Sequence, residues 1–368
     1  MAEGAAKDGF LLHDLVMAEH ARPKDRSIQT LRGVAVLLMV AGHVIGSSGG
    51  RGMNVADDSI WRWFYVALED IRMPLFTVIS GHVYAMRPIR SFADYPSLAR
   101  GKARRLLIPL VTVGLLLFVL QISVPGTNSR PELNELAWFF VFPFHYGHLW
   151  FLQSMFLIFL TVAALDACGV TRTRAGWAIA TVSALVVFVA VRVPSSADVF
   201  SVNGYFRLLP FFLIGYGLHR YGVEKGRRVA VGVTLLAFLA VYSARTIGTV
   251  NEWNLAPRVD RVLELAVGVT GVVSIYSARR LVDWAPLAWV GGFSFGIYLL
   301  HVFGSAASRI FARAMGIDAD VALFVIGMVA GVGLPIMFQL IFGRWNLVWV
   351  GILGEKRRRS DRAASVHV

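Results

Sequence analysis

The stretch Leu31-Arg-Gly-Val-Ala-Val-Leu-Leu-Met-Val-Ala-Gly-His43-Val-Ile45 decides the class of fold. Between Arg32 and His43 it contains no polar side chain, and an α-helix needs a run of about 20 mostly apolar residues to cross a bilayer. Similar runs recur along the whole chain of 368 residues, of which 56% are hydrophobic and 16% are charged. An ordinary soluble domain has about 25% charged residues. The sequence therefore predicts an all-α, polytopic membrane protein.

Hydropathy divides the chain into a hydrophilic tail (1–30), a membrane domain (31–345) and a basic tail (346–368). The segment Glu135–Phe144 is too short to cross a bilayer, so we interpret it as an interfacial or re-entrant piece. About ten membrane-spanning helices are predicted, over residues 31–48, 60–86, 106–124, 148–168, 175–193, 205–221, 229–245, 259–278, 287–306 and 321–343.

The basic residues predict the orientation. With a cytoplasmic N-terminus, 24 of the 36 Lys and Arg residues fall in inner segments and seven in outer segments. Cytoplasmic loops of membrane proteins are enriched in Lys and Arg. Ten helices with both termini in the cytoplasm therefore fit the sequence, and a full crossing by Glu135–Phe144 would reverse most of this bias.

Charge and motifs exclude several functions. The net charge of +13 would suggest nucleic-acid binding in a soluble protein, but here it follows from the basic loops. Cys168 is the single cysteine, which excludes an intrachain disulfide and a cysteine-based metal site. The chain lacks zinc-hydrolase, serine-hydrolase, Walker and dinucleotide-binding motifs, so no metal and no nucleic-acid partner is predicted.

Arg32 and His43 are ionisable residues within the first span, where such groups default to functional hypotheses. Eleven residues of helix correspond to a rise of about 16 Å and a net rotation of only about 20°. Both side chains then share one side of the helix, Arg32 near the cytoplasm and His43 beyond mid-membrane. A ligand entering from inside would place its anionic end at Arg32 and its reacting end near His43. The alternative is an arginine that snorkels to lipid headgroups and a histidine hydrogen-bonded to a neighbouring helix.

The segment from Asp25 to Gly33, followed by His43, resembles the Arg-x10-His signature of the acyltransferase-3 family, integral membrane O-acyltransferases of bacteria and some eukaryotes. The likeness covers about residues 25–345. Further segments are similar to motifs of that family in the same order: Arg72-Met-Pro-Leu-Phe76 with Ile79-Ser80-Gly81, Lys102-Ala-Arg-Arg-Leu-Leu-Ile-Pro109, His148-Leu-Trp150-Phe-Leu152, Phe211-Phe-Leu-Ile-Gly-Tyr216 and Ser294-Phe-Gly-Ile-Tyr298-Leu-Leu-His301.

Two positions depart from the family pattern. Family members often have His where this chain has Arg72, and usually an aromatic residue where it has His82. No catalytic role is carried over to either residue.

The predicted topology sorts the candidate residues into two layers. Cations of the inner layer suit the phosphates of coenzyme A, although plain positive-inside charge explains them as well. In the outer layer, Glu69 and Asp70 are adjacent and point about 100° apart, so we favour a structural ion pair of one of them with Arg72 or Arg207. Trp150 is alternatively an interfacial anchor, and His301 a hydrogen-bonded histidine. The candidates for acyl-CoA binding are Arg32, Ser80, Lys102 and Arg105, and those for acceptor binding are Glu69, Arg72, His148, Trp150, Arg207, Tyr298 and His301.

The resemblance implies an O-acyltransferase of the bacterial cytoplasmic membrane. Acetyl-CoA or another acyl-CoA would donate an acyl group to a hydroxyl of an extracytoplasmic glycan or lipid-linked sugar. In this hypothesis His43 is the general base and Arg32 positions the donor. A transporter or flippase using the buried ionisable residues as a path, and a structural partner in a glycan-assembly complex, are the alternatives. The sequence leaves the acceptor, the acyl chain and the oligomeric state open.

Overall fold

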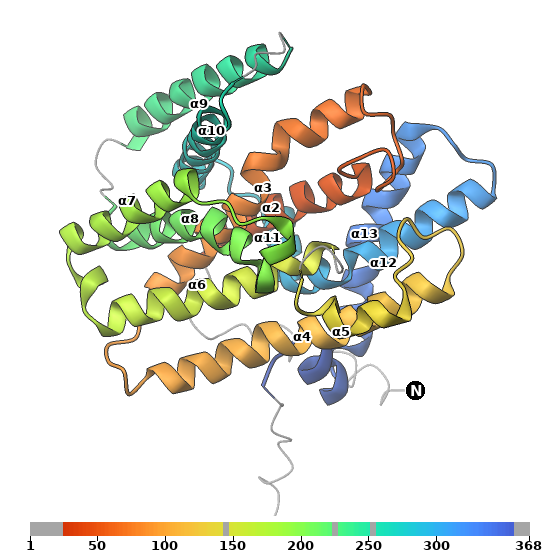
Figure 1. Ribbon diagram of the computed structural model, residues 1–368, viewed down its shortest axis with the longest axis horizontal. Coiled ribbons are helices and arrows are strands. Elements are labelled where there is room, and N and C mark those ends of the chain that lie inside the picture. Colours follow the sequence, from red (N-terminus) through yellow and green to blue (C-terminus); the bar gives the residue numbers. More distant parts are fainter. Residues whose placement is uncertain (1–24, 143–146, 223–226, 251–254, 357–368) are drawn as a thin grey trace, which may run out of the picture.

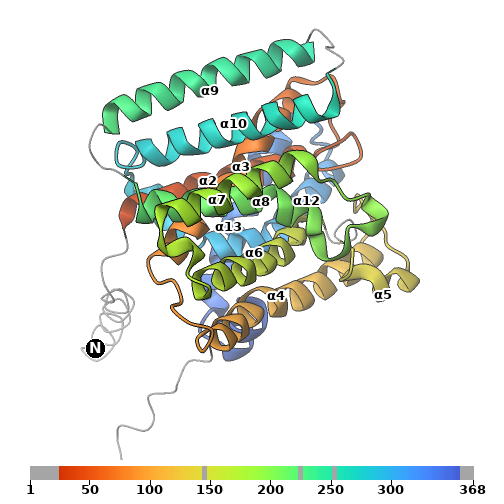
Figure 2. The ribbon, with the colours of Figure 1, turned by 60° about the vertical axis from the view of Figure 1, so that its left-hand side comes forward.

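The computed structural model describes residues 25–142, 147–222, 227–250 and 255–356, and within these ranges the chain is helical, without strands. The long helices pack with roughly aligned axes, and α9 lies at one edge of the bundle (Figures 1 and 2). The long helices are α2 (Arg26–Ile45), α3 (Ile60–Ala85), α4 (Tyr95–Ser123), α6 (Trp150–Ala167), α7 (Arg174–Ala190), α8 (Val202–Arg220), α9 (Arg227–Val250), α10 (Pro257–Ala278), α12 (Ser294–Ala314) and α13 (Asp320–Phe342).

The short helical elements connect or flank these helices. They are α5 (Leu136–Phe139), α11 (Ala285–Gly292), a π-helical turn (Val348–Ile352) and 3-10 turns at Leu133–Glu135, Gly147–Leu149, Val170–Arg172, Ser195–Ala197 and Val199–Ser201.

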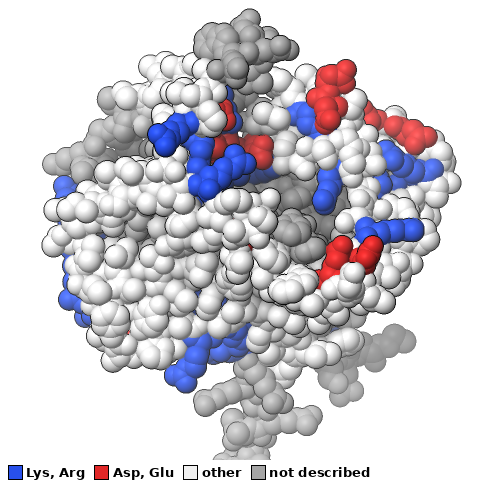
Figure 3. Space-filling view, in the orientation of Figure 1, with Lys and Arg blue, Asp and Glu red and all other residues white. Residues whose placement is uncertain are grey.

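The prediction of an all-α polytopic membrane protein is confirmed. Eight helices of the described chain are long and apolar enough to cross a membrane. The two other long helices are α7, which has 17 residues, and α3, which carries four charged residues. The face seen in Figure 3 has a broad uncharged area with groups of charged side chains around it. The number of crossings and their direction stay predictions.

Several helix boundaries differ from the predicted ones, and α4 begins at Tyr95 where the predicted span begins at residue 106. The first helix begins at Arg26, five residues before the predicted span, and the Asp25 side chain accepts a hydrogen bond from the Ser27 backbone NH at its start. The predicted helix 287–306 is two helices, α11 and α12, which meet at Phe293 after a Gly-Gly pair. Glycine is a poor helix former, and hydropathy does not register it.

Glycines bring α2 and α11 into backbone contact. A Cβ atom on Gly33 would overlap the carbonyl oxygen of Leu287, and one on Gly291 would overlap that of Gln29. Only glycine fits at such distances. This contact fixes the inner half of α2, including Arg32.

The described ends of the chain lie at one end of the bundle. Asp25 precedes α2, and Arg105 near the start of α4 forms an ion pair with Glu355. The Arg32 and Arg105 guanidinium groups are close enough to interact electrostatically. We call this end of the bundle, predicted to face the cytoplasm, the inner end, and the opposite one the outer end.

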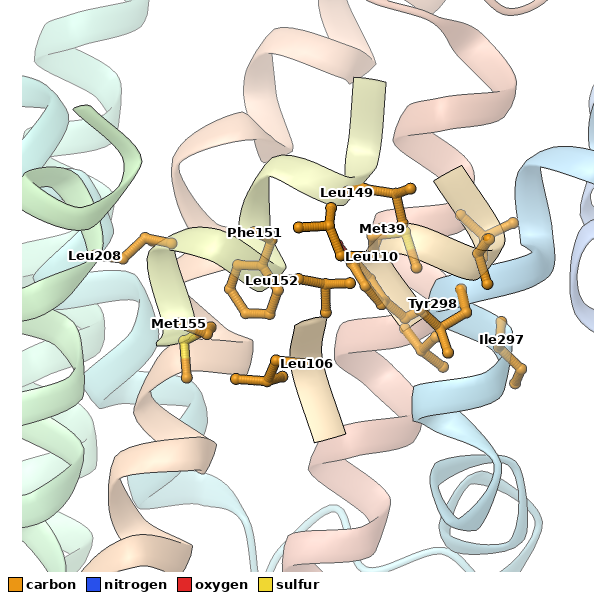
Figure 4. Close-up of a cluster of buried hydrophobic side chains, with 14 of the residues drawn as sticks. Met39, Leu106, Leu110, Leu149, Phe151, Leu152, Met155, Leu208, Ile297 and Tyr298 are labelled. Atoms are coloured by element: carbon orange, nitrogen blue, oxygen red, sulfur yellow. The ribbon is translucent and has the colours of Figure 1, made fainter. Parts of the chain in front are cut away.

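A layer of buried apolar side chains fills the middle of the bundle between α2, α4, α6 and α12 (Figure 4). We call it the apolar layer. Its members are at most 6% exposed: Met39, Leu106, Leu110, Leu152 and Ile297. Each of these helices carries polar or aromatic site residues on both sides of the layer.

Candidate active site

Three histidines from separate elements meet at the outer side of the apolar layer. His43 lies near the end of α2, His148 in the turn before α6, and His301 in α12. The ring centroids are 4.9 Å apart for His43 and His301, 4.8 Å for His148 and His301, and 6.0 Å for His43 and His148. The structure therefore brings together three candidates that lie far apart in sequence. We call them the histidine cluster.

Hydrogen bonds distinguish the three rings. The Nδ1 of His301 lies 3.1 Å and 2.9 Å from the carbonyl oxygens of Ile297 and Tyr298, so this nitrogen carries the proton. The Nε2 of His148 donates to the carbonyl of Leu299 at 3.3 Å. His43 makes no hydrogen bond within the described part of the chain.

Burial distinguishes them as well. His148 and His301 are 3% and 0% exposed, whereas His43 is half-buried. Both ring nitrogens of His43 are unbonded and its side chain is accessible. His43 is therefore the member of the cluster best placed to take a proton from a bound molecule.

A cavity of about 470 Å³ opens beside the cluster, lined by His43, His148 and Trp150 among others. We call it the outer cavity. Tyr298 supports its wall, since the hydroxyl of Tyr298 donates to the carbonyl oxygen of His148 at 2.6 Å. The size of the cavity suits one small organic group.

Arg72 lies behind this cavity. Its guanidinium carbon stacks 4.2 Å from the ring centroid of Tyr65, a cavity-lining residue. A Cβ on Gly42, the residue before His43, would overlap its Nη1. Arg72 is 7% exposed, and its Nη1 has no hydrogen-bond partner.

The inner side of the apolar layer has a pocket of about 740 Å³ between the start of α4 and the chain after the π-helical turn. We call it the inner basic pocket. The Lys102 ammonium lies 3.5 Å from the Phe159 ring centroid, and the Arg105 guanidinium 4.0 Å from that of Phe295. The charged residues that line the pocket are Arg90, Asp94, Lys102, Arg104, Arg105 and Glu355.

Ser80 does not line the inner basic pocket. Its hydroxyl donates to the carbonyl of Phe76, one turn earlier in α3, at 2.9 Å. At the same end of α3, His82 shares a 2.7 Å hydrogen bond with the hydroxyl of Tyr276. The contacts of Ser80 are thus those of a serine satisfied by its own helix.

Glu69 and Arg207 line a different cavity, of about 460 Å³, which we call the charged cavity. Arg207 pairs with Asp70 at 3.3 Å and with Glu264 at 2.8 Å. The predicted structural ion pair therefore forms, through Asp70 rather than Glu69. Trp150 lines this cavity and the outer cavity alike.

Sequence reasoning missed three residues of the outer cavity: Arg51, Tyr65 and Arg309. Arg309 was expected in a loop, because the predicted helix stopped at residue 306. Instead α12 continues to Ala314, and the Nη2 of Arg309 donates to the carbonyl of Gly126 at 3.1 Å. Helix periodicity from His301 through Ser305 to Arg309 was the available signal.

No group of three or more His, Cys, Asp or Glu side chains that could hold a metal ion occurs among the described residues.

A family model described as an acyltransferase domain matches residues 25–340 of this chain. The match covers the three elements that carry the histidine cluster and the α4 side of the inner basic pocket, and it ends before Gly354 and Glu355 on the other side of that pocket. No curated protein and no solved structure matches the chain.

Proposed function

The chain belongs to the acyltransferase-3 family, and from this premise we propose that it is an acyl-CoA-dependent O-acyltransferase of the bacterial cytoplasmic membrane. It transfers an acyl group, in the first instance acetyl, to a hydroxyl of an extracytoplasmic glycan or lipid-linked sugar. The observation that carries the proposal is His43. This histidine lines the outer cavity with both ring nitrogens unbonded, on the same helix as Arg32.

The reaction needs a base because an alcohol is almost entirely un-ionised at neutral pH. His43 removes the hydroxyl proton as the oxygen attacks the thioester carbonyl. The tetrahedral intermediate collapses with cleavage of the carbon–sulfur bond, and the imidazolium returns the proton to the departing CoA thiolate. A positioned general base typically contributes a factor of about 10²–10⁴.

The inner basic pocket supports the donor side of the proposal. Arg and Lys are the residues that bind phosphate groups in proteins, and the pocket collects four of them on one side of the apolar layer. Arg105 lies at this pocket and within electrostatic range of Arg32. In the proposed complex these cations hold the nucleotide phosphates of acyl-CoA.

The route between the two halves follows four helices. From the inner to the outer side, α2 carries Arg32, Met39 and His43 in that order. About 16 Å of helix rise separates Arg32 from His43. α12 has the same order, with Phe295 on the inner side, Ile297 in the apolar layer and His301 on the outer side. The pantetheine arm of CoA would pass between the side chains of the apolar layer. The thioester then reaches His43 while the phosphates stay at the inner end.

The test uses the full-length protein in nanodiscs with radiolabelled acetyl-CoA and a lipid and glycan extract from the encoding organism. Label transfer is preferable to thiol detection because Cys168 is exposed and would react with a thiol reagent. We expect label in the extract and a loss of at least about 100-fold in the His43→Ala variant. Transport without chemistry would leave all label on CoA.

His219→Ala is the matched control, since this exposed histidine lies at the inner end of α8. It should transfer label like the wild type. A His43→Ala protein that folds, inserts and retains the wild-type rate would remove the assigned base and with it the mechanism.

A further inference from the structure

The outer cavity carries positive charge that no described residue neutralises. Of the described residues that line it, two are charged, Arg51 and Arg309, and neither Asp nor Glu is among them. Arg72 adds a third cation behind Gly42. This is unexpected at the end of the bundle where basic residues are scarce.

Arg72 is the clearest case of a positive charge near this cavity without a negative partner. Arg62, on the same helix and equally buried at 7% exposure, pairs with Asp57 at 3.2 Å and donates to the carbonyls of Gly46 and Val55. Arg72 has no carboxylate partner among the described residues, and its Nη1 is buried without an acceptor. A buried charge without a partner is costly.

Arg309 shows the same feature at the cavity wall. It is 8% exposed, and the acceptor found for it is a backbone carbonyl. Arg313, which acts on it electrostatically, is also basic. The charged cavity offers the contrast, because there Arg207 has two carboxylate partners.

We propose that the acceptor of this enzyme is anionic: a hydroxyl compound with a phosphate or carboxylate group that binds in the outer cavity at Arg309, with the charge of Arg72 acting on it from behind the Gly42 wall. The anion would supply the missing counter-charge and place a neighbouring hydroxyl at His43. This inference rests on the proposed function for the identity of the ligand as an acceptor. A phosphate points to a lipid-linked or phosphorylated sugar, and a carboxylate to an acidic glycan.

Direct binding tests this inference without any acyl donor. Three probes of similar size, glucose 1-phosphate, glucuronate and methyl glucoside, are titrated into the full-length protein in nanodiscs at fixed ionic strength. We expect one or both anionic probes to bind at least about tenfold more tightly than methyl glucoside, because hydrogen bonds to charged groups are stronger than those between neutral groups. Preference for glucose 1-phosphate alone assigns the anion as phosphate, and preference for glucuronate alone assigns it as carboxylate.

Variants locate the anion. Arg72→Gln and Arg309→Gln should each weaken the preferred probe about tenfold and leave methyl glucoside unchanged. Arg130→Gln, which removes an exposed positive charge next to the cavity-lining Ser129, controls for long-range attraction and should stay within twofold. Thermal unfolding checks that the variants are folded, and Arg309→Gln keeps the test decisive if Arg72→Gln is unstable.

The inference is overturned if the anionic probes show no preference over methyl glucoside, including no binding of any probe. It is also overturned if the preference survives both substitutions. A protein whose anion binding depends on Arg72 and Arg309 yet transfers no label from acetyl-CoA would refute the proposed function instead. Loss of turnover in Arg72→Gln with unchanged probe binding would assign this arginine to the reacting thioester and reject an acceptor role.

Discussion

The contact between α2 and α11 makes a quantitative prediction for Gly291→Ala. A methyl group there would overlap the carbonyl oxygen of Gln29 and lie 2.9 Å from its carbonyl carbon and 3.0 Å from the backbone nitrogen of Gly33. These are backbone atoms of a helix and cannot rotate aside, so the two helices must separate. Overpacking of a buried contact costs about 1–3 kcal/mol, and alanine returns up to about 1 kcal/mol relative to glycine in a helix. We expect a net loss of about 1–2 kcal/mol.

The neighbouring residue supplies the control, because a Cβ on Gly292 would have no heavy atom within 4 Å. Gly292→Ala should therefore be as stable as the wild type or slightly more stable. Thermal unfolding of the purified proteins in the same detergent measures the difference. Since Arg32 precedes Gly33, Gly291→Ala should also weaken acyl-CoA binding. Equal unfolding midpoints for the two variants would show that the helices do not approach as closely as described.

Three further predictions concern the donor side. Leu110→Trp fills the apolar layer, so it should reduce acyl transfer more than tenfold while CoA affinity stays within twofold of the wild type. Leu115→Trp, at a 39% exposed position of the same helix, is the control and should leave acyl transfer intact. Equal transfer rates in the two variants would show that the acyl group takes another route. Glu355→Gln frees Arg105 from a partly exposed ion pair worth about 0.2–1 kcal/mol, so CoA affinity measured by titration should rise up to about fivefold, and a fall would argue against phosphate binding there. Arg32→Ala should chiefly weaken acyl-CoA binding; unchanged affinity would return Arg32 to the role of a snorkelling side chain.

Much of the fold could be predicted because each membrane helix corresponds to a continuous apolar stretch of the sequence. All ten predicted spans correspond to helices, and α2 carries both Arg32 and His43 as its periodicity required. The predictions that failed were helix boundaries that depend on interactions other than hydrophobic burial. α12 continues past its apolar run to Ala314, and Arg309 on this extension donates to the carbonyl of Gly126, a contact with another segment that hydropathy does not describe.

The sequence singled out several residues that line the candidate site but did not predict their arrangement. His148 and His301 were identified singly, yet their meeting with His43 depends on how three elements pack, which sequence spacing does not encode. For Ser80, a hydrogen bond within its own helix accounts for the hydroxyl group, and the sequence does not show this bond. The choice of Asp70 over Glu69 as the partner of Arg207 depends on which residue faces α8.

The separation of charge explains why such an enzyme would move the acyl group rather than the acceptor. Taking an unpaired ionised group from water into an apolar interior is prohibitively costly, and the side chains of the apolar layer, among them Met39 and Leu110, are hydrocarbons or thioethers that offset none of that cost. A thioester with a short acyl chain carries no charge and is narrow. In the proposed mechanism the phosphates of the donor would therefore stay among the cations at the inner end and the anionic acceptor among those at the outer end. His43 is then the group at which the neutral thioester, once through the layer, would first meet a hydroxyl.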